Sequence, residues 1–128
     1  MTRSKYGAKK VTIDGITFDS KAEAKFYTQL KDNGVEFELQ PRFLLQSSFK
    51  KNGKNFRKIE YIADFKIGNR IIDIKGMETE AFKIKKKLFE YKYPELRLEL
   101  LRECPKKHMH HGTFGFIELE LYKKICKK

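Results

Sequence analysis

The chain has 128 residues, of which 40% are hydrophobic and 36% charged, and its formal net charge at pH 7 is +12. This length and composition predict one folded domain over residues 1–128 and exclude a wholly disordered chain. No apolar run approaches the ~20 residues that a membrane helix needs, and the basic N-terminus lacks the apolar segment of a secretory signal. We therefore expect a cytoplasmic location and no membrane partner.

Positive charge is spread along the whole sequence. Residues 1–58 carry 13 basic and 6 acidic side chains, and residues 59–128 carry 16 and 11. A polyanion such as DNA or RNA is therefore the leading partner, because phosphate neutralisation and counterion release drive such binding. A basic surface that serves only solubility is the alternative.

The first residues predict an arm followed by a short hairpin. Residues 1–8 are basic and polar, which indicates either a mobile arm that contacts nucleic acid on binding or an ordinary disordered end. Asp14-Gly15 suits the turn of a hairpin between residues 10–13 and 16–18.

A helix is predicted to begin at Ser20 or Asp19 and to run to about Asn33, with Gly34 as its stop signal. Ser20 and Glu23 match a capping box, in which the glutamate needs no further purpose. However, Glu23 also lies on the apolar face of the helical wheel. It is therefore either a cap or a third carboxylate directed at the sheet.

The next segment predicts two strands and a basic loop. Residues 35–39 alternate like a strand, Gln40-Pro41 interrupts the pattern, and residues 42–45 resume it. Residues 46–58 hold five basic side chains around Asn52-Gly53, which indicates a hairpin tip or a mobile loop.

Two aromatic residues, Phe49 and Phe56, are interleaved with the basic side chains of residues 46–58. This mixture suits a loop that faces DNA, because aromatic rings stack on bases while basic groups neutralise phosphates. The alternative is a solvated loop whose two rings enter the core.

A β-hairpin is predicted over residues 59–67 and 70–75, because both residues of Gly68-Asn69 tolerate the positive φ of a two-residue turn. In this register the numbers of facing residues add up to 137. Asp64 then lies opposite Asp73. Like charges that face each other across an antiparallel pair destabilise it.

The two faces of this hairpin differ in character. Alternation puts Tyr61 with the apolar side chains on one face, whereas Asp64, Asp73 and Lys75 share the other. Facing carboxylates become favourable when a divalent cation lies between them, because Mg²⁺ takes oxygen ligands, usually one or two carboxylates with water and substrate phosphate. The hairpin therefore predicts half of a metal site, which Lys75 can also reach.

A second helix is predicted over residues 77–93, begun near Thr79 and ended by Pro94. Lys85 lies in its apolar stripe, where it either contacts phosphate near the site or extends along the helix edge to water. Residues 96–102 alternate as a final strand next to the centre of the sheet.

The C-terminal part gives weaker signals. Cys104 and the histidines at His108, His110 and His111 lack the spacing of a structural zinc site, which favours a polar loop over zinc. Cys104 and Cys126 are expected to be reduced thiols. Residues 114–125 fit a strand or an amphipathic helix. The order of elements predicts an α/β fold, a mixed β-sheet flanked by helices.

Seven short motifs stand in order between residues 5 and 100. They are Lys5-Tyr6, Asp14-Gly15-Ile16, Phe18-Asp19-Ser20-Lys21-x-Glu23-Ala24, Gln40-Pro41, Ala63-Asp64-Phe65, Asp73-x-Lys75-Gly76 and Phe82-x-x-Lys85. This set resembles the PD-(D/E)XK nuclease superfamily, which includes restriction endonucleases and Holliday-junction resolvases, and within it a small phage-encoded branch. The proline that names the superfamily is replaced by Ala63.

The resemblance implies a restriction-endonuclease-like core and a Mg²⁺-dependent endodeoxyribonuclease, with Mn²⁺ able to substitute. Asp64, Asp73 and the Ile74 backbone carbonyl would ligate the metal, and Glu23 would do so directly or through water. Lys75 would position or activate the attacking water and stabilise charge on the scissile phosphate. DNA contacts are expected from Lys85, Lys50, Lys51, Lys54, Arg57, Lys58 and Gln40.

The implied substrate is branched or duplex DNA of recombination or replication, cut in the host cytoplasm if the protein is phage-encoded. A resolvase would be a homodimer, because it must cut two strands symmetrically. One competing hypothesis is a non-catalytic basic DNA- or RNA-binding module with an incidental acidic pair. A structural or assembly protein is another, which leaves both the charge and the carboxylates unexplained.

Overall fold

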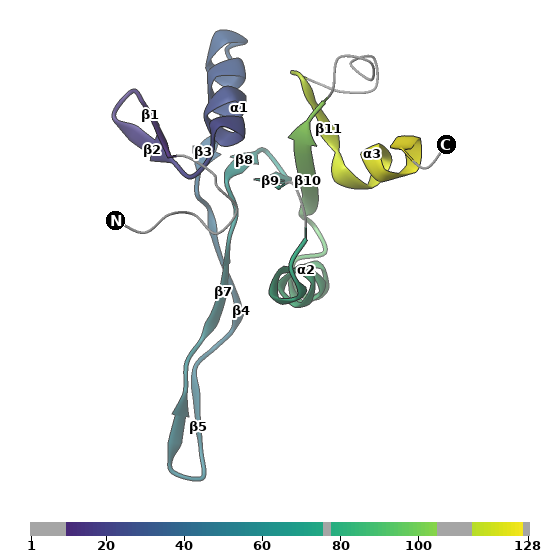
Figure 1. The fold of residues 1–128 in the computed structure, drawn as a ribbon. Coiled ribbons are helices and arrows are strands. Elements are labelled where there is room, and N and C mark those ends of the chain that lie inside the picture. The colour runs from purple at the N-terminus through teal and green to yellow at the C-terminus, as the bar shows by residue number, and fades with distance from the viewer. Residues whose placement is uncertain (1–9, 76–77, 105–113, 127–128) are drawn as a thin grey trace. The chain divides into compact units, whose positions relative to one another are not determined.

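A computed structural model describes residues 10–75, 78–104 and 114–126 (Figure 1). The fold is mixed α/β, with a multi-stranded mixed sheet and three helices among the described residues. The chain divides into two compact units: unit 1 is Met1–Glu36 with Leu101–Lys128, and unit 2 is Phe37–Leu100. The single domain expected from the sequence stays a prediction, and each unit is described by itself. No described helix is long and apolar enough to cross a membrane.

The predicted hairpin and helix of unit 1 are confirmed. β1 (Val11–Ile13) pairs antiparallel with β2 (Ile16–Phe18), and α1 (Lys21–Asp32) follows. Asp14 and Gly15 have φ of 53° and 77°, the left-handed values that this turn requires. The Tyr27 hydroxyl of α1 donates to the Asp14 carboxylate at 2.9 Å, which ties the hairpin to the helix.

The undecided C-terminal segment contains both a strand and a helix. β11 (Phe116–Glu118) pairs antiparallel with the last residues of β10 (Arg97–Glu103), and α3 (Leu119–Cys126) follows directly. β10 is therefore not the final strand that the sequence predicted. Phe116 packs edge-on against Phe26 of α1, with the ring centroids 5.1 Å apart. The residues of the predicted N-terminal arm and the three histidines lie outside the described residues.

Unit 2 contains a sheet and one helix. Neighbouring strands of the sheet are β10, β9 (Arg70–Ile74), β8 (Phe65–Ile67) and β3 (Glu38–Leu39), in that order. α2 (Glu80–Lys92) connects β9 to β10, as predicted. The Thr79 hydroxyl accepts the Phe82 N–H at 3.1 Å and so caps the start of α2.

A long two-stranded ribbon extends from this sheet (Figure 1). It consists of β3 and β8, then β4 (Arg42–Gln46) with β7 (Ile59–Ile62), then β5 (Phe49–Lys51) with β6 (Lys54–Phe56). The numbers of facing residues add up to 104 near the sheet and, beyond a bulge at Leu44–Gln46, to 105 as far as the turn. Residues 46–58 are therefore a hairpin tip, one of the two structures predicted.

The ribbon corrects two predicted strands. Residues 59–67 form two strands instead of one, and residues 35–39 form only β3. Both strands break at the same level, because Gln40 has a φ of 47° and Pro41 lacks an N–H to donate. Two backbone bonds bridge the break: Gln40 N–H to the Asp64 carbonyl at 3.0 Å, and Ala63 N–H to the Pro41 carbonyl at 3.1 Å.

An aromatic core joins α2 to the base of the ribbon. Phe89 of α2 packs edge-on against Phe43 and Tyr61, with centroid separations of 5.0 and 5.7 Å. The Tyr93 hydroxyl donates to the Leu44 carbonyl at 2.8 Å. Phe89 is fully buried, and burial of a side chain of this size contributes about 1.5–3 kcal/mol. The base of the ribbon is thereby packed against α2.

Candidate active site

Asp64 lies directly before β8, and Asp73 lies in β9. The predicted register of this hairpin is confirmed over β8, where the numbers of facing residues in β8 and β9 add up to 137. The Asp64 N–H donates to the Ile72 carbonyl at 3.1 Å, so Asp64 lies beside Ile72 at the end of this pairing, and its position directly opposite Asp73 stays a prediction. The Asp64 Oδ2 accepts the Ile74 N–H at 2.8 Å, which places this carboxylate next to the residue that follows Asp73. Asp73 is only 5% exposed.

Lys75 lies at the same pair of carboxylates. Its Nζ is 3.7 Å from the Asp73 Oδ2, and the side chain is 28% exposed. The ammonium also lies 4.5 Å from the centroid of the Phe82 ring, the distance of a cation–π contact. These two contacts hold a positive charge beside the carboxylates while part of the side chain stays open to water.

Tyr61 is a site residue that sequence reasoning placed on the wrong face. Its hydroxyl donates to the Asp73 Oδ2 at 2.5 Å. Burial, then the negative charges of Asp73 and Asp64, raise the pKa of the Tyr61 hydroxyl well above its usual value, so it keeps its proton and remains a donor. The break at Ala63-Asp64 explains the error, because strict alternation does not pass through residues outside a strand.

A signal for Tyr61 is present in the sequence. Pro41 marks an interruption, and the turn at Asn52-Gly53 places residues 40 and 41 opposite residues 63 and 64, apart from the one-residue bulge. Pairing the two predicted strands across that turn would have predicted a break beside Asp64.

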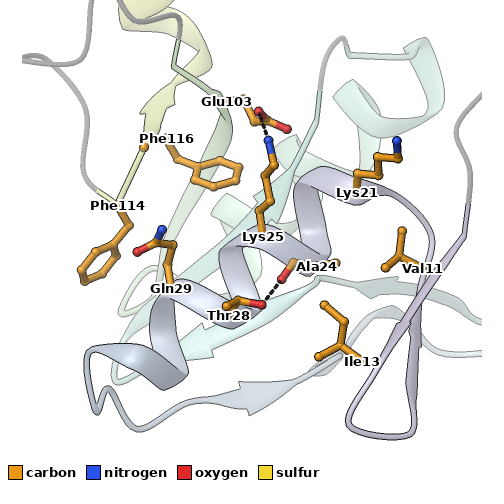
Figure 2. Close-up of a pocket in the computed structure, with 11 residues that line it drawn as sticks. Val11, Ile13, Lys21, Ala24, Lys25, Thr28, Gln29, Glu103, Phe114 and Phe116 are labelled. Carbon is orange, nitrogen blue, oxygen red and sulfur yellow. Dashed lines mark hydrogen bonds and ion pairs between the residues drawn. The ribbon is translucent and has the colours of Figure 1, made fainter.

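A pocket of about 610 Å³ lies in unit 1 (Figure 2). Val11, Ala24 and Phe116 contribute to its apolar lining. The ion pair between Lys25 and Glu103, at 3.1 Å, lies at its edge. Neither the aspartates nor Lys75 line it, so the predicted site does not depend on this pocket.

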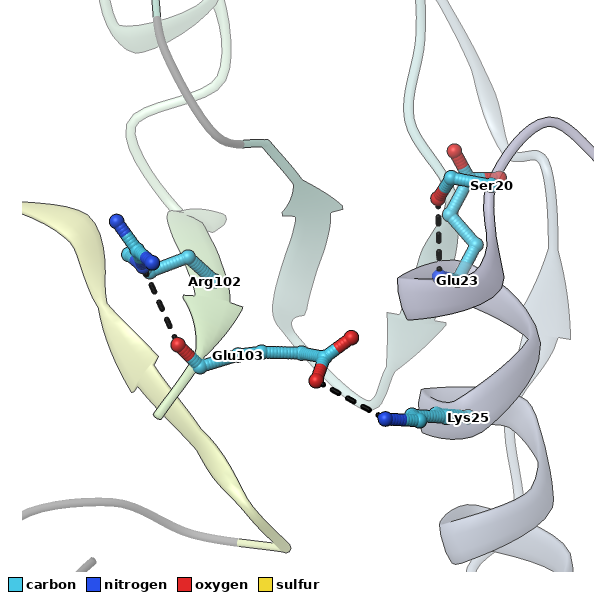
Figure 3. Close-up of polar contacts among 5 residues, drawn as sticks. All are labelled: Ser20, Glu23, Lys25, Arg102 and Glu103. Atoms are coloured by element: carbon cyan, nitrogen blue, oxygen red, sulfur yellow. Dashed lines mark hydrogen bonds and ion pairs between the residues drawn. The ribbon is translucent and has the colours of Figure 1, made fainter. Parts of the chain in front are cut away.

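The backbone N–H of Glu23 takes part in the N-terminal cap of α1, in unit 1. The Ser20 Oγ accepts the Glu23 N–H at 3.2 Å, as the capping box predicted (Figure 3). The Glu23 side chain is half-buried. The aspartate pair belongs to unit 2, so the role of Glu23 as a third carboxylate stays a prediction.

The predicted DNA-binding residues lie in three places of unit 2. Gln40 is exposed at the break of the ribbon, and Lys85 is half-buried on α2. Five lie exposed at or near the ribbon tip: Lys50, Lys51, Lys54, Arg57 and Lys58. Lys58 forms an ion pair with Glu60 at 3.2 Å, whereas the rest of the tip contains no acidic residue.

The rings of Phe49 and Phe56 do not enter the core, so that alternative is wrong. They are 44% and 43% exposed. The two rings stack on each other, with centroids 4.7 Å apart and an angle of 8° between their planes.

A family model described as "Protein of unknown function (DUF1064)" matches residues 3–109. The chain belongs to the DUF1064 family. The match to DUF1064 includes all of unit 2, and Glu23 also lies within it. Searches of curated proteins and of solved structures found no significant match.

Proposed function

We propose that this protein is a Mg²⁺-dependent endodeoxyribonuclease with a restriction-endonuclease-like core, acting on branched or duplex DNA. The observation that carries the proposal is the geometry of one hairpin. The Asp64 carboxylate accepts the N–H of Ile74, the residue that follows Asp73, and the Lys75 ammonium lies 3.7 Å from the Asp73 carboxylate. Metal-assisted phosphodiester hydrolysis uses this set of groups. In a protein that merely binds phosphates, such an acidic pair would only lower the stability of the hairpin.

The chemistry of the carboxylate pair fits an oxygen-ligated divalent cation. Two carboxylates offer about eight acceptor lone pairs, more than the Tyr61 hydroxyl, the Ile74 amide and the Lys75 ammonium use. Asp64, Asp73 and the Ile74 carbonyl would hold Mg²⁺, and Mn²⁺ would substitute. When bound there, the cation would supply Lewis-acid chemistry by polarising the phosphodiester and favouring ionisation of the attacking water.

The protein groups have separate tasks in this proposal. The Lys75 ammonium orients the attacking water and stabilises negative charge that develops on the phosphate oxygens. Phe82 and Asp73 fix the position of this ammonium. Tyr61 fixes the rotamer of Asp73 through its short hydrogen bond and does not take up or release the reacting proton, because its pKa is raised.

The charge of the molecule supports nucleic acid as the substrate. The net charge of +12 favours association with DNA, and the basic ribbon tip offers phosphate contacts without competing acids. Branched DNA is the preferred substrate in this proposal, as an intermediate of recombination or replication. A second copy of the chain would then be needed to cut the opposite strand, so we expect a homodimer on the junction.

The test compares three labelled DNAs, a four-way junction, a linear duplex and a single strand, each with Mg²⁺, Mn²⁺ or EDTA. We expect cleavage only with the metals, fastest on the junction. Asp73→Asn keeps the side-chain size and an acceptor for Tyr61 but removes the charge, so it should abolish cleavage while binding in EDTA persists. Glu95→Gln, at an exposed position outside the site, is the matched control. Normal cleavage by Asp73→Asn would remove the assignment.

The basic ribbon tip also favours a second candidate, a DNA- or RNA-binding module without catalysis. That function predicts tight, salt-dependent binding of all three DNAs or of RNA, and no metal-dependent cleavage of any. The same experiment therefore separates the two candidates.

A further inference from the structure

The end of the ribbon is an exposed basic element with no core of its own. Every residue of β5 and β6 is exposed, and so are the turn residues Asn52 and Gly53. Residues 46–58 carry five basic and no acidic side chains. The tip also lies far from α2 in unit 2 (Figure 1). Neither packing within unit 2 nor charge balance explains a sequence of this kind.

The two phenylalanines of the tip stand out against this background. Phe49 and Phe56 face each other across β5 and β6 and form a parallel stack of two rings. More than 40% of each side chain remains exposed to water. A lysine-rich ribbon that only needed to stay soluble would carry polar residues at these positions.

The side chains of the tip are sorted between its two faces. Lys51 faces Lys54, two positions further towards the turn than the phenylalanine pair, and therefore lies on the same face as the rings. Lys50 and Asn55 face each other on the opposite side. One face thus presents two stacked rings with two ammonium groups about 7 Å farther along the strands.

We propose that this face binds DNA where base stacking is interrupted, as at a branch point. The Phe49–Phe56 pair stacks on an exposed base, and Lys51 and Lys54 contact the phosphates beside it. Proteins that bind single-stranded nucleic acid use aromatic side chains to stack on the bases and basic side chains to contact the phosphates. Apolar side chains also enter between bases where a duplex is kinked. In a continuous duplex the bases are stacked on each other, so the rings can contact the face of a base there only after that base has unstacked. The proposal rests on the proposed function and names the feature that selects its substrate.

The test measures binding in EDTA, without cleavage, by fluorescence anisotropy on a four-way junction and on a linear duplex of equal length. Replacing both rings, Phe49→Ala with Phe56→Ala, should weaken junction binding about tenfold or more and duplex binding less than threefold. Lys51→Ala with Lys54→Ala should weaken both DNAs and lower the slope of log affinity against log salt by about 1.8. Asn55→Ala changes a neutral exposed residue on the opposite face and is the matched control for the rings.

A second readout shows whether the rings touch a base. A junction with 2-aminopurine at the branch point should lose fluorescence on binding to the wild-type protein, and this quenching should be absent with the double phenylalanine variant. Far-UV circular dichroism checks that each variant is folded. Equal loss of affinity on both DNAs, or unchanged quenching without the rings, would overturn the proposal.

The binding measurements and the cleavage assay of the proposed function can fail independently of each other. An inactive wild-type protein that still prefers the junction through its rings would retain the tip as a DNA-binding element and remove the nuclease. A metal-dependent nuclease whose junction preference ignores the rings would do the reverse.

Discussion

The base and the tip of the ribbon in unit 2 are built from the same two antiparallel segments of the chain, but they differ in burial and in charge. At the base, Asp64 lies beside Asp73, and the latter is almost completely buried. At the tip, all side chains are exposed and the only charges are positive. α2 and β9 cover the base, whereas the tip extends beyond them (Figure 1). An alternating strand pattern therefore does not itself determine burial. Burial depends on the elements that pack against each part of the strand.

The largest difference is expected for aromatic truncation at the two ends. Phe65 at the base is fully buried, so Phe65→Ala should lower the free energy of unfolding by about 3–5 kcal/mol. Phe56→Ala at the tip should lower it by less than about 1 kcal/mol, because the ring contacts mainly Phe49 and water. Urea unfolding followed by circular dichroism measures both. Similar losses would break the comparison, since they would mean that the tip is part of the core.

A lysine at the carboxylates and a lysine on the exposed face of α2 should differ in their effect on cleavage. Lys75→Ala should slow metal-dependent cleavage by about 10²–10³-fold, the usual effect of removing a group that stabilises transition-state charge. DNA affinity in EDTA should change little. Lys83→Ala is the matched control, because Lys83 is exposed on α2 and pairs only with Glu80 among the described contacts, at 3.4 Å. Equal rates for the Lys75 variant and the wild type in single-turnover assays would contradict the role of Lys75.

The hydrogen bond from the Tyr61 hydroxyl to Asp73 is expected to stabilise the base of the ribbon. Tyr61→Phe removes the donor to Asp73 and leaves a buried carboxylate oxygen less well satisfied, so the free energy of unfolding should fall by about 1.5–3 kcal/mol. Tyr91→Phe, at a position 88% exposed, should have no measurable effect. In the double variant with Asp73→Ala the two losses should not add, because each change removes the same hydrogen bond. Strict additivity would show that the bond contributes nothing to stability.

The smallest effect is a dependence of stability on alkaline pH. An unfolded tyrosine loses its proton near pH 10, whereas the pKa of Tyr61 in the folded chain is raised. Below pH 10 the stabilisation is fully present, and above it the free energy of unfolding should fall by about 1.4 kcal/mol per pH unit. Tyr61→Phe should lack this contribution, so the stability difference between wild type and variant should shrink from pH 9 to 11. Parallel pH curves would show that Tyr61 ionises equally in both states.

Much of the local structure was predictable from short-range signals. The Gly68-Asn69 turn predicted the register of β8 and β9, which is confirmed from the turn as far as Phe65 and Ile72. Ser20 and Thr79 predicted the starts of α1 and α2. These signals are reliable because a turn or a cap depends on the φ values and hydrogen bonds of a few adjacent residues.

Other features could not be predicted in this way. The hydroxyl of Tyr61 reaches Asp73 because the ribbon breaks at Gln40-Pro41, far from both residues in the sequence. The C-terminal segment changes from strand to helix at Glu118–Leu119, although its residues fit either structure. Both outcomes depend on which distant segment supplies the hydrogen bonds and the apolar contacts.

Local sequence signals determined the turns, the helix starts and the register of β8 with β9, and the composition determined the excess of positive charge. Only the tertiary structure decided that Asp73 is buried with a tyrosine as its donor and that Phe49 and Phe56 remain exposed. The physical reason is that turns and caps are local to the chain, whereas burial and the partner of a buried carboxylate require contacts between segments tens of residues apart.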